Sequence, residues 1–212
     1  MGLRNSENIY GGVELTQAIT VLKDAHLGET LWIVGTGPSL QFLRCTHFGA
    51  GPVMAVNRSI NLVRNLALPN VLYSMQKDGG DKKRCPNCGE FCGAVTPPPL
   101  GVPLIVQYHA SEKCFPTWEP RYIMDLQKDF GIPWWLFSIA TCAHLARLMG
   151  CAKVVYLCCD SMKGDLQSYV VDHNGIGTLV KQNCGYGRYP GLLGLELKKL
   201  GMSAEYVYPE EK

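Results

Sequence analysis

Short hydrophobic runs alternate along the chain with segments whose apolar residues recur at helical spacing. The runs end in small or polar residues and predict strands at 31–35, 52–57, 70–75, 102–108, 152–159 and 204–208. Helices are predicted at 12–27, 60–66, 138–150 and 191–200. Alternating strands and helices favour parallel pairing, so the pattern predicts an α/β protein with a mostly parallel, Rossmann-like sheet and helices on both faces.

The first strand lies within LWIVGTGPSL and ends in a turn that leads into a helix-prone segment. Gly35 and Gly37 let the backbone turn tightly and approach a ligand, and Pro38 suits a first helical turn. Ser39 can cap that helix or bond a phosphate oxygen. Unpaired N–H groups and the positive end of the helix dipole would meet here, which predicts a phosphate site. An ordinary strand-to-helix turn is the alternative.

Polar residues follow the other predicted strands as well. In an open parallel sheet, the residues just past the carboxyl ends of the strands share one crevice, and that crevice binds ligands. Taken singly, each residue suits a local capping or turn role. Because so many predicted strands end in polar residues, the sequence predicts a ligand site at the carboxyl ends of the strands. Its members are Asn57 to Ser59, Gln76 to Asp78, His109 to Ser111, and Asp160 with Ser161.

The stretch from about 78 to 101 interrupts this rhythm and predicts a Cys-rich insertion in a single domain spanning 1–212. Its RCPNCGEFC contains Cys85, Cys88 and Cys92. Paired thiolates two residues apart, with a glycine turn, suit tetrahedral zinc, so we predict a structural zinc knuckle. Cys114 and His109 are the candidates that would complete the ligand set, while a redox pair or free thiols are the alternatives.

Three residues outside the strand ends suggest acid–base or anion chemistry. His173, in SYVVDHNG, is an acid–base candidate, with a solvated loop histidine as the alternative. Tyr186 and Arg188, in CGYGRYPG, could close a hydroxyl and a guanidinium over an anionic ligand. The cysteines on predicted helices and strands are expected to be buried core residues; these are Cys142, Cys151, Cys158 and Cys159. His144 lies in the middle of a predicted helix and is expected to be a core or surface histidine, not a catalyst.

Composition narrows the class of protein. The 212 residues carry a net charge of +2, which gives no general drive toward nucleic acid or membranes. Only the run Lys82, Lys83 and Arg84 is strongly basic, so a nucleic-acid acceptor rests on that run alone. No apolar segment is long enough to span a bilayer, and the N-terminus does not resemble a signal peptide. The sequence therefore predicts a cytoplasmic protein whose ten cysteines are reduced thiols or metal ligands.

The order of the motifs resembles the bacterial sialyltransferases, which begin with a strand and GNGPSL. It is also similar to the Rossmann-like family of archaeal pterin pyrophosphokinase-like proteins. The matching segments are VGTGPSL, AVNRSINL, SIATCAHLARLMGCAKVVYLCCD and SYVVD. They cover most of the chain outside the first predicted helix and the cysteine insertion.

The resemblance implies that a sugar nucleotide lies along these motifs, with Ser138 helping to hold it and Tyr169 touching the leaving phosphate. Thr36 stands where the family has asparagine, which leaves the base and sugar open. Tyr186 stands where the family has its catalytic histidine, so the catalytic base is displaced or different. The residues implied nearest the nucleotide are Gly35, Thr36, Gly37, Ser39 and Asn57.

The sequence therefore predicts a nucleotide-dependent transferase, a glycosyltransferase with a nucleotide-sugar donor and an unidentified acceptor. His173 or Asp160 would deprotonate the acceptor, while Tyr169, Tyr186 or Arg188 would stabilise the departing phosphate. One alternative is a pyrophosphokinase that uses ATP, with Mg²⁺ held by Asp160 and by Asp78, which follows the third predicted strand. A zinc-stapled nucleotide-binding module without catalysis is the other.

Overall fold

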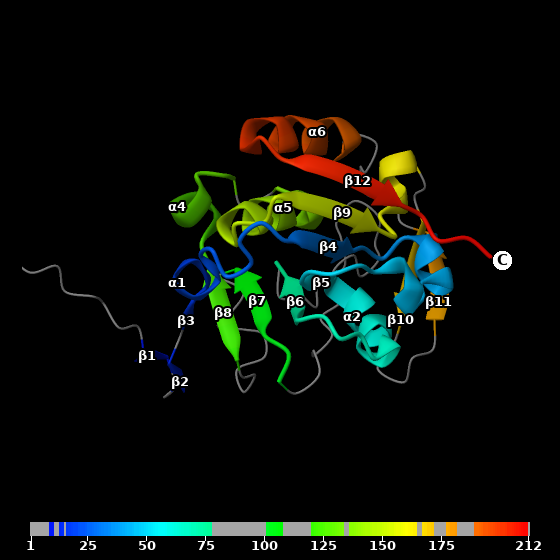
Figure 1. The fold of residues 1–212 in the computed structure, drawn as a ribbon, viewed down its shortest axis with the longest axis horizontal. Helices are drawn as coiled ribbons and strands as arrows, with labels where there is room; N and C mark the ends of the chain where they lie inside the picture. Colours follow the sequence, from blue (N-terminus) through cyan, green and yellow to red (C-terminus); the bar gives the residue numbers. More distant parts are fainter. Residues whose placement is uncertain are drawn as a thin grey trace, which may run out of the picture.

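The computed structural model describes residues 9–10, 13–14, 16–77, 101–107, 120–133, 136–164, 167–171, 177–181 and 189–211. Its centre is an eight-stranded sheet in which every neighbouring pair of strands is parallel (Figure 1). The predicted α/β class with a parallel sheet is thus confirmed. In spatial order the strands are β12 (Ser203–Val207), β9 (Lys153–Leu157), β4 (Thr30–Val34), β5 (Val53–Val56), β6 (Leu72–Gln76), β7 (Leu104–Gln107), β8 (Arg121–Met124) and β3 (Thr16–Gln17).

Two apolar clusters lie on opposite faces of this sheet. Successive strand residues point to opposite faces, so on β4 Ile33 packs into one cluster and Val34 into the other. The first cluster contains residues of α1 (Ala18–Leu22), α5 (Ser138–Leu148) and α6 (Tyr189–Leu200), and also Leu126 of the short helix α4 (Leu126–Phe130). The second contains Leu40 of the 3₁₀ helix η1 (Pro38–Phe42) and residues of α2 (Ile60–Val63). Helices therefore cover both faces, as predicted.

The chain order creates a switch point between β9 and β4, the second and third strands of the sheet. From β4 the chain proceeds through β5, β6, β7 and β8 toward one edge, and then returns to place β9 on the other side of β4. The connections leaving β4 thus diverge from those leaving β9. In open α/β sheets, ligands bind outside the carboxyl ends of the strands at such a point.

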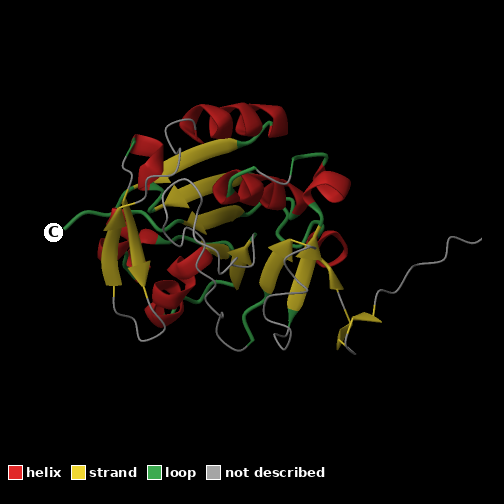
Figure 2. Ribbon diagram, turned by 180° about the vertical axis from the view of Figure 1, so that it is seen from behind, coloured by secondary structure: helices red, strands yellow, loops and turns green. Residues whose placement is uncertain are grey.

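A hairpin of β10 (Gln167–Val171) and β11 (Gly177–Lys181) stands at the end of the sheet toward which β4, β9 and β12 point (Figure 1). Figure 2 shows the same hairpin from behind. Its strand β10 contacts η1 and the 3₁₀ helix η3 (Asn57–Ser59), which follows β5. Asn61 Nδ2 donates to Val171 O at 2.7 Å, and Tyr169 N donates to Thr36 O at 2.7 Å. The sequence did not predict this hairpin, which borders the switch point.

The first predicted helix is wrong in length. Residues 12–27 were expected to form one helix, but only Ala18–Leu22 does so. Thr16 and Gln17 instead pair with β8, and Asp24 has a left-handed φ of +55° while its N–H donates to Leu148 O. Extended pairing on one side and a left-handed turn on the other therefore limit α1. Residues 13–14 form β2 (Val13–Glu14), which pairs with β1 (Ile9–Tyr10).

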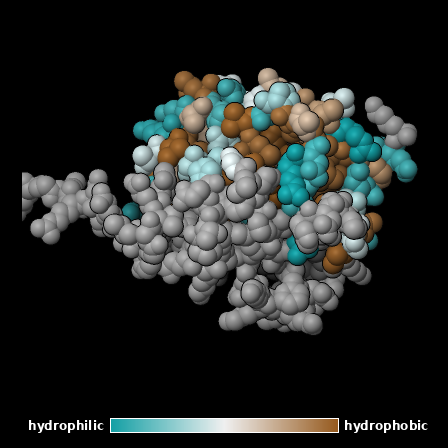
Figure 3. Space-filling view, turned by 90° about the horizontal axis from the view of Figure 1, so that it is seen from below, coloured by the Kyte–Doolittle hydropathy of each residue, from teal (hydrophilic) through white to brown (hydrophobic). Residues whose placement is uncertain are grey.

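The last two helices follow the predicted pattern, and two further elements were not predicted. α5 and α6 lie at the predicted places, whereas β8 and α4 lie between the predicted strand 102–108 and the predicted helix 138–150. In the described ranges no helix is both long enough and apolar enough to cross a membrane. Seen from below, hydrophobic and hydrophilic residues lie side by side on the described part (Figure 3).

Candidate functional site

The turn after β4 is closed against the end of β9. Gly35 N donates to Leu157 O, and Gly37 N donates to Cys158 O, each at 2.8 Å. A Cβ atom on Gly35 would lie 2.7 Å from Cys158 O, and one on Gly37 would collide with the Asp160 carboxylate. The two glycines therefore permit the close approach of the β9 end, whereas the sequence assigned their freedom to the approach of a ligand.

Asp160 lies against the start of η1. Ser39 Oγ donates to Asp160 Oδ2 at 2.7 Å, and Ser39 N donates to Oδ1 at 3.4 Å. Both residues are buried, and Asp160 begins the 3₁₀ helix η5 (Asp160–Lys163). The donors that the sequence offered to a phosphate are thus directed at a carboxylate. An additional anion at this spot would be repelled by Asp160, while sugar hydroxyls could donate to it.

The element after the turn also differs from the prediction. The segment was expected to begin a helix with a useful dipole, but η1 is a five-residue 3₁₀ helix. Short 3₁₀ helices have poor hydrogen-bond geometry and few aligned peptide dipoles, so the positive end of η1 is weak. The predicted phosphate position at Gly35 to Ser39 therefore has neither free Ser39 donors nor a strong dipole.

Backbone strain marks the two strand ends that flank β4. Asn57 directly follows β5 with φ +53°, and Cys158 directly follows β9 with φ +57°. A left-handed backbone costs a residue other than glycine about 1–2 kcal/mol, somewhat less for asparagine, and such strain gathers at functional sites. The Ser59 hydroxyl lies 2.9 Å from two backbone acceptors, Val34 O and Val56 O. This contact ties the turn after β5 to β4. The strand ends are therefore held rigidly around the switch point.

The Cys158 thiol is adjacent to this site but unsuited to nucleophilic attack. Burial raises the pKa of Cys158 to about 12, with the Asp160 charge adding to the rise and the Ser39 hydroxyl opposing it. The thiol is therefore neutral at physiological pH, and only a thiolate is strongly nucleophilic. Together with Cys142, Cys151 and Cys159 it is buried and free, which confirms the prediction of core cysteines.

Two residues near Asp160 were missed by the sequence analysis. Tyr208 directly follows β12, and Lys163 Nζ lies 3.6 Å from the centroid of its ring. Burial, followed by nearby Cys159 and Asp160, raises the pKa of Tyr208 to about 12. The phenol and the ammonium group thus adjoin the Asp160 side of the switch point. Tyr208 ends the last predicted strand, so its position at a strand end was the available signal.

The other predicted residues that the structure describes lie at different distances from this centre. Tyr169 reaches Thr36 through its backbone N–H, while a Cβ atom on Gly177 would collide with its ring. Ser138 begins α5 and is half-buried, and no hydrogen bond between described residues joins it to the turn after β4. The Phe137 ring beside it stacks on Tyr189 at the start of α6, with ring centroids 4.3 Å apart.

Several predicted residues lie outside the described ranges, so their predictions stand as predictions. In the part of the chain that is described, no three His, Cys, Asp or Glu side chains form a group that could hold a metal. Of the two positions expected for His144, core or surface, the structure shows the core: it is buried, and its Nε2 lies 2.9 Å from Glu196 Oε2. The residues outside the described ranges are Asp78, Lys82, Lys83, Arg84, Cys85, Cys88, Cys92, His109, Ser111, Cys114, His173, Tyr186 and Arg188.

The fold and the strand ends define a parallel α/β protein with a candidate ligand site at the carboxyl ends of β4, β5 and β9. A comparison with known protein families finds no match, and a comparison with curated proteins finds none either. The function of the site therefore has to be argued from its geometry.

Proposed function

We propose that the chain is a nucleotide-dependent transferase whose nucleotide lies across the carboxyl ends of β4, β5 and β9. The observation that carries this proposal is the switch point between β4 and β9, where strained Asn57, strained Cys158 and the Ser39–Asp160 pair converge. Switch points of open parallel sheets bind nucleotides in many unrelated proteins, so the position supports a nucleotide more than it supports any particular chemistry.

The polar groups suit different parts of a sugar nucleotide. The Asp160 carboxylate already accepts from Ser39 and has further lone pairs for hydroxyl groups of a ribose or a transferred sugar. The Asn57 amide offers a donor and an acceptor to a base. Transfer would break the bond between the sugar and the departing phosphate and form one to an acceptor oxygen, whose proton must pass to a base. Asp160 is the base candidate on a described element, and His173 is the other candidate.

Titration calorimetry with CMP, UMP, AMP and GMP tests nucleotide binding. We expect Asn57→Ala to abolish binding of the nucleotide that the wild type prefers, with an unchanged far-ultraviolet circular dichroism spectrum. Asn57→Gly is the matched variant, because glycine accepts the left-handed backbone and removes only the side chain. Binding that survives both substitutions would contradict the proposed position of the nucleotide.

Turnover distinguishes a transferase from a binding module. We expect incubation with CMP-, UDP- and GDP-linked sugars to release free nucleotide from one donor class, and Asp160→Asn to slow that release. Binding without any turnover, across these donors and across nucleoside triphosphates, would favour the non-catalytic alternative.

One observation favours a magnesium-dependent pyrophosphokinase as the second candidate. The buried Asp160 carboxylate at the switch point is the kind of oxygen ligand that Mg²⁺ takes, usually together with phosphates of the substrate. Treatment with EDTA, followed by return of Zn²⁺ alone, separates the two candidates. Nucleotide binding that persists after this treatment supports the sugar transferase, whereas binding that returns only with Mg²⁺ supports the pyrophosphokinase.

A further inference from the structure

Within the described part of the chain, Arg58 has a side-chain donor without a partner, close to the candidate site. It lies in η3, directly after β5 and next to the strained Asn57. Its side chain is half-buried, and Nε is fully buried without a hydrogen-bond partner among the described residues. A buried donor that lacks a partner costs roughly 1–3 kcal/mol, so such groups in native structures call for an explanation.

Among the residues that the structure describes, Arg58 also has no acidic partner. The ion pairs between described residues are His26–Glu29, His144–Glu196, Lys153–Glu205 and Lys199–Glu196, and none of them includes Arg58. Burial lowers the pKa of its guanidinium, as expected for a cation that is partly removed from water. The group nonetheless stays protonated at physiological pH because the pKa of arginine is so high. A guanidinium that is partly removed from water, and whose Nε has no partner in the described part of the chain, is suited to bind a phosphate or carboxylate.

Two residues of opposite charge thus lie just past the strands that flank β4. Asp160 follows β9 and accepts from Ser39, so that side favours hydroxyl donors. Arg58 follows β5 and has no anionic partner among the described residues, so that side favours an anion. The hairpin strand β10 contacts both η1 and η3 and thus borders the two sides together.

We propose that Arg58 binds the phosphate of the nucleotide, on the β5 side of the switch point and away from η1. This inference rests on the proposed function for the identity of the anion, since a guanidinium recognises any phosphate. The sequence placed the phosphate at the turn formed by residues 35–39. The position proposed for it now lies beside β5, on the side of β4 that faces away from β9. The Ser39–Asp160 pair is then left to the ribose or the transferred sugar.

Paired titrations test this assignment. Each nucleoside monophosphate and its nucleoside, for example CMP and cytidine, are titrated into the wild type, Arg58→Gln and Arg147→Gln. Arg147 is exposed in the last turn of α5, so its substitution removes the same charge at the opposite edge of the sheet. We expect Arg58→Gln to weaken nucleotide binding by about 10- to 100-fold and to leave nucleoside binding unchanged. Arg147→Gln should leave both unchanged.

Equal nucleotide affinity in the wild type and Arg58→Gln would overturn the assignment, and so would an equal loss for nucleoside and nucleotide. If circular dichroism shows that Arg58→Gln does not fold, the nucleotide affinity of Arg58→Lys tests the assignment in its place. Lysine keeps the charge but lacks the planar fork, so a loss of nucleotide affinity beyond threefold supports the assignment and a smaller one opposes it.

Inorganic pyrophosphate separates failure of this assignment from failure of the proposed function. If neither nucleotides nor nucleosides bind the wild type, the proposed function is wrong. Pyrophosphate binding that is lost only in Arg58→Gln would then still support an anion site. Absence of pyrophosphate binding, or equal binding in both proteins, would in that case overturn the anion site as well.

Discussion

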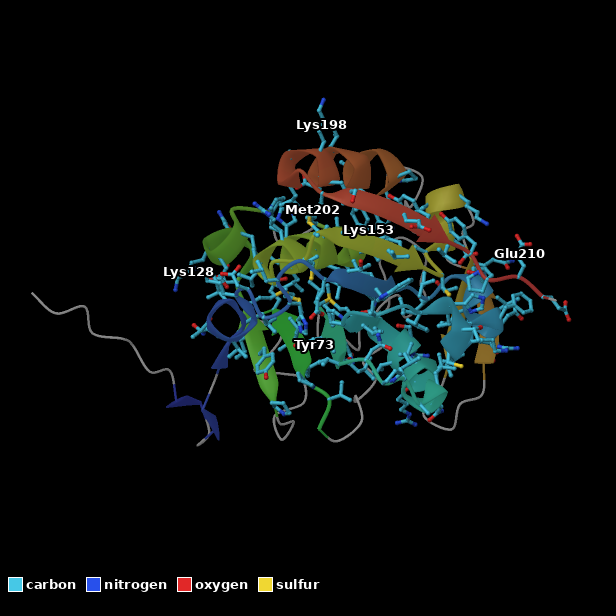
Figure 4. The ribbon with its side chains drawn as sticks, viewed as in Figure 1. Tyr73, Lys128, Lys153, Lys198, Met202 and Glu210 are labelled. Carbon is cyan, nitrogen blue, oxygen red and sulfur yellow. The ribbon has the colours of Figure 1, made fainter. Side chains whose placement is uncertain are left out.

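The two ends of the parallel strands differ in how their buried polar side chains are bonded. Where the strands begin, which we call the amino edge, His26 is hydrogen-bonded to neighbouring side chains; where they end, the carboxyl edge, several buried polar atoms have no partner among the described residues. His26 is buried at the amino edge, and its ring nitrogens lie 3.1 Å from Glu29 Oε2 and 2.9 Å from the Tyr73 hydroxyl. Figure 4 shows Tyr73 on β6, within the sheet. By contrast, the buried side-chain atoms without a partner in the described ranges belong to the last residue of β7, to η3 after β5, and to α2, which follows η3. They are Arg58 Nε, Asn61 Oδ1 and Gln107 Oε1.

The difference separates stability from function. A folded chain satisfies nearly all of its buried polar groups, so a satisfied network such as His26, Glu29 and Tyr73 contributes to the fold. Groups that remain unsatisfied on one edge reduce stability, and they persist where a ligand completes them. The amino edge therefore reads as the structural edge of the sheet, and the carboxyl edge as the one prepared for a ligand.

The largest expected effect comes from filling the space between η1 and Asp160. Gly37→Ala should lower the free energy of unfolding by about 2–3 kcal/mol, because the added methyl group displaces the Asp160 carboxylate from Ser39. Gly194→Ala in α6 is the matched control, since nothing lies within 4 Å of the added atom. It should raise stability by about 0.5–1 kcal/mol, because alanine favours a helix. Urea unfolding measures both, and shifts of the same sign would contradict the close packing of the β4–β9 junction.

The sequence predicted the elements of this junction but could not predict its chemistry. The strands on either side of the switch point are continuous apolar runs, so their places followed from local pattern alone. Ser39 and Asp160 are 121 residues apart, and no local pattern shows that one would accept from the other. The same holds for Gly37. The sequence explained this glycine by a tight turn, whereas in the structure it makes room for the carboxylate of Asp160, which is far away in the sequence.

The hairpin and the first helix were mispredicted for a related reason. Tyr169 belongs to a short segment without a strict apolar alternation. This segment forms a strand because Tyr169 pairs with Leu179 and donates its backbone N–H to Thr36 O. Thr16 and Gln17 fit a helical pattern but pair with β8 instead. In both regions tertiary contacts outweigh local propensity, which amounts to only fractions of a kcal/mol per residue.

A smaller effect is expected from breaking the amino-edge network. Tyr73→Phe leaves His26 Nε2 without its 2.9 Å partner, so the free energy of unfolding should fall by about 1–2 kcal/mol. Tyr206→Phe is the control, because Tyr206 is 38% exposed and its loss of a hydroxyl should matter by less than about 0.5 kcal/mol. Nucleotide affinity should be unchanged in both variants. A loss of affinity in Tyr73→Phe would show that the amino edge is not purely structural.

Alkaline pH should affect the two edges alike. Burial is the main cause that raises the pKa of Tyr73 and of Tyr208 to about 12, on opposite edges of the sheet. An unfolded tyrosine loses its proton near pH 10, so between about pH 10 and 12 the unfolded chain binds fewer protons than the folded one. Stability should therefore fall as the pH rises through this range. Tyr73→Phe and Tyr208→Phe should each make the fall shallower in urea titrations, and an unchanged slope would contradict their burial.

The smallest expected effect is an increase in stability, and it concerns Arg58 at the carboxyl edge. Arg58→Met removes the buried Nε donor and keeps an unbranched side chain of apolar atoms, so the free energy of unfolding should rise by about 0.5–1 kcal/mol. Arg44→Met is the control, because its guanidinium donates to Gln41 O and Leu43 O and its loss should not stabilise the fold. At the same nucleotide concentration, the wild type should then be stabilised more than Arg58→Met, since stabilisation by a ligand that binds only the native state grows with the logarithm of its affinity. A loss of stability in Arg58→Met without nucleotide would mean that Arg58 supports the fold, and the carboxyl edge would then resemble the amino edge.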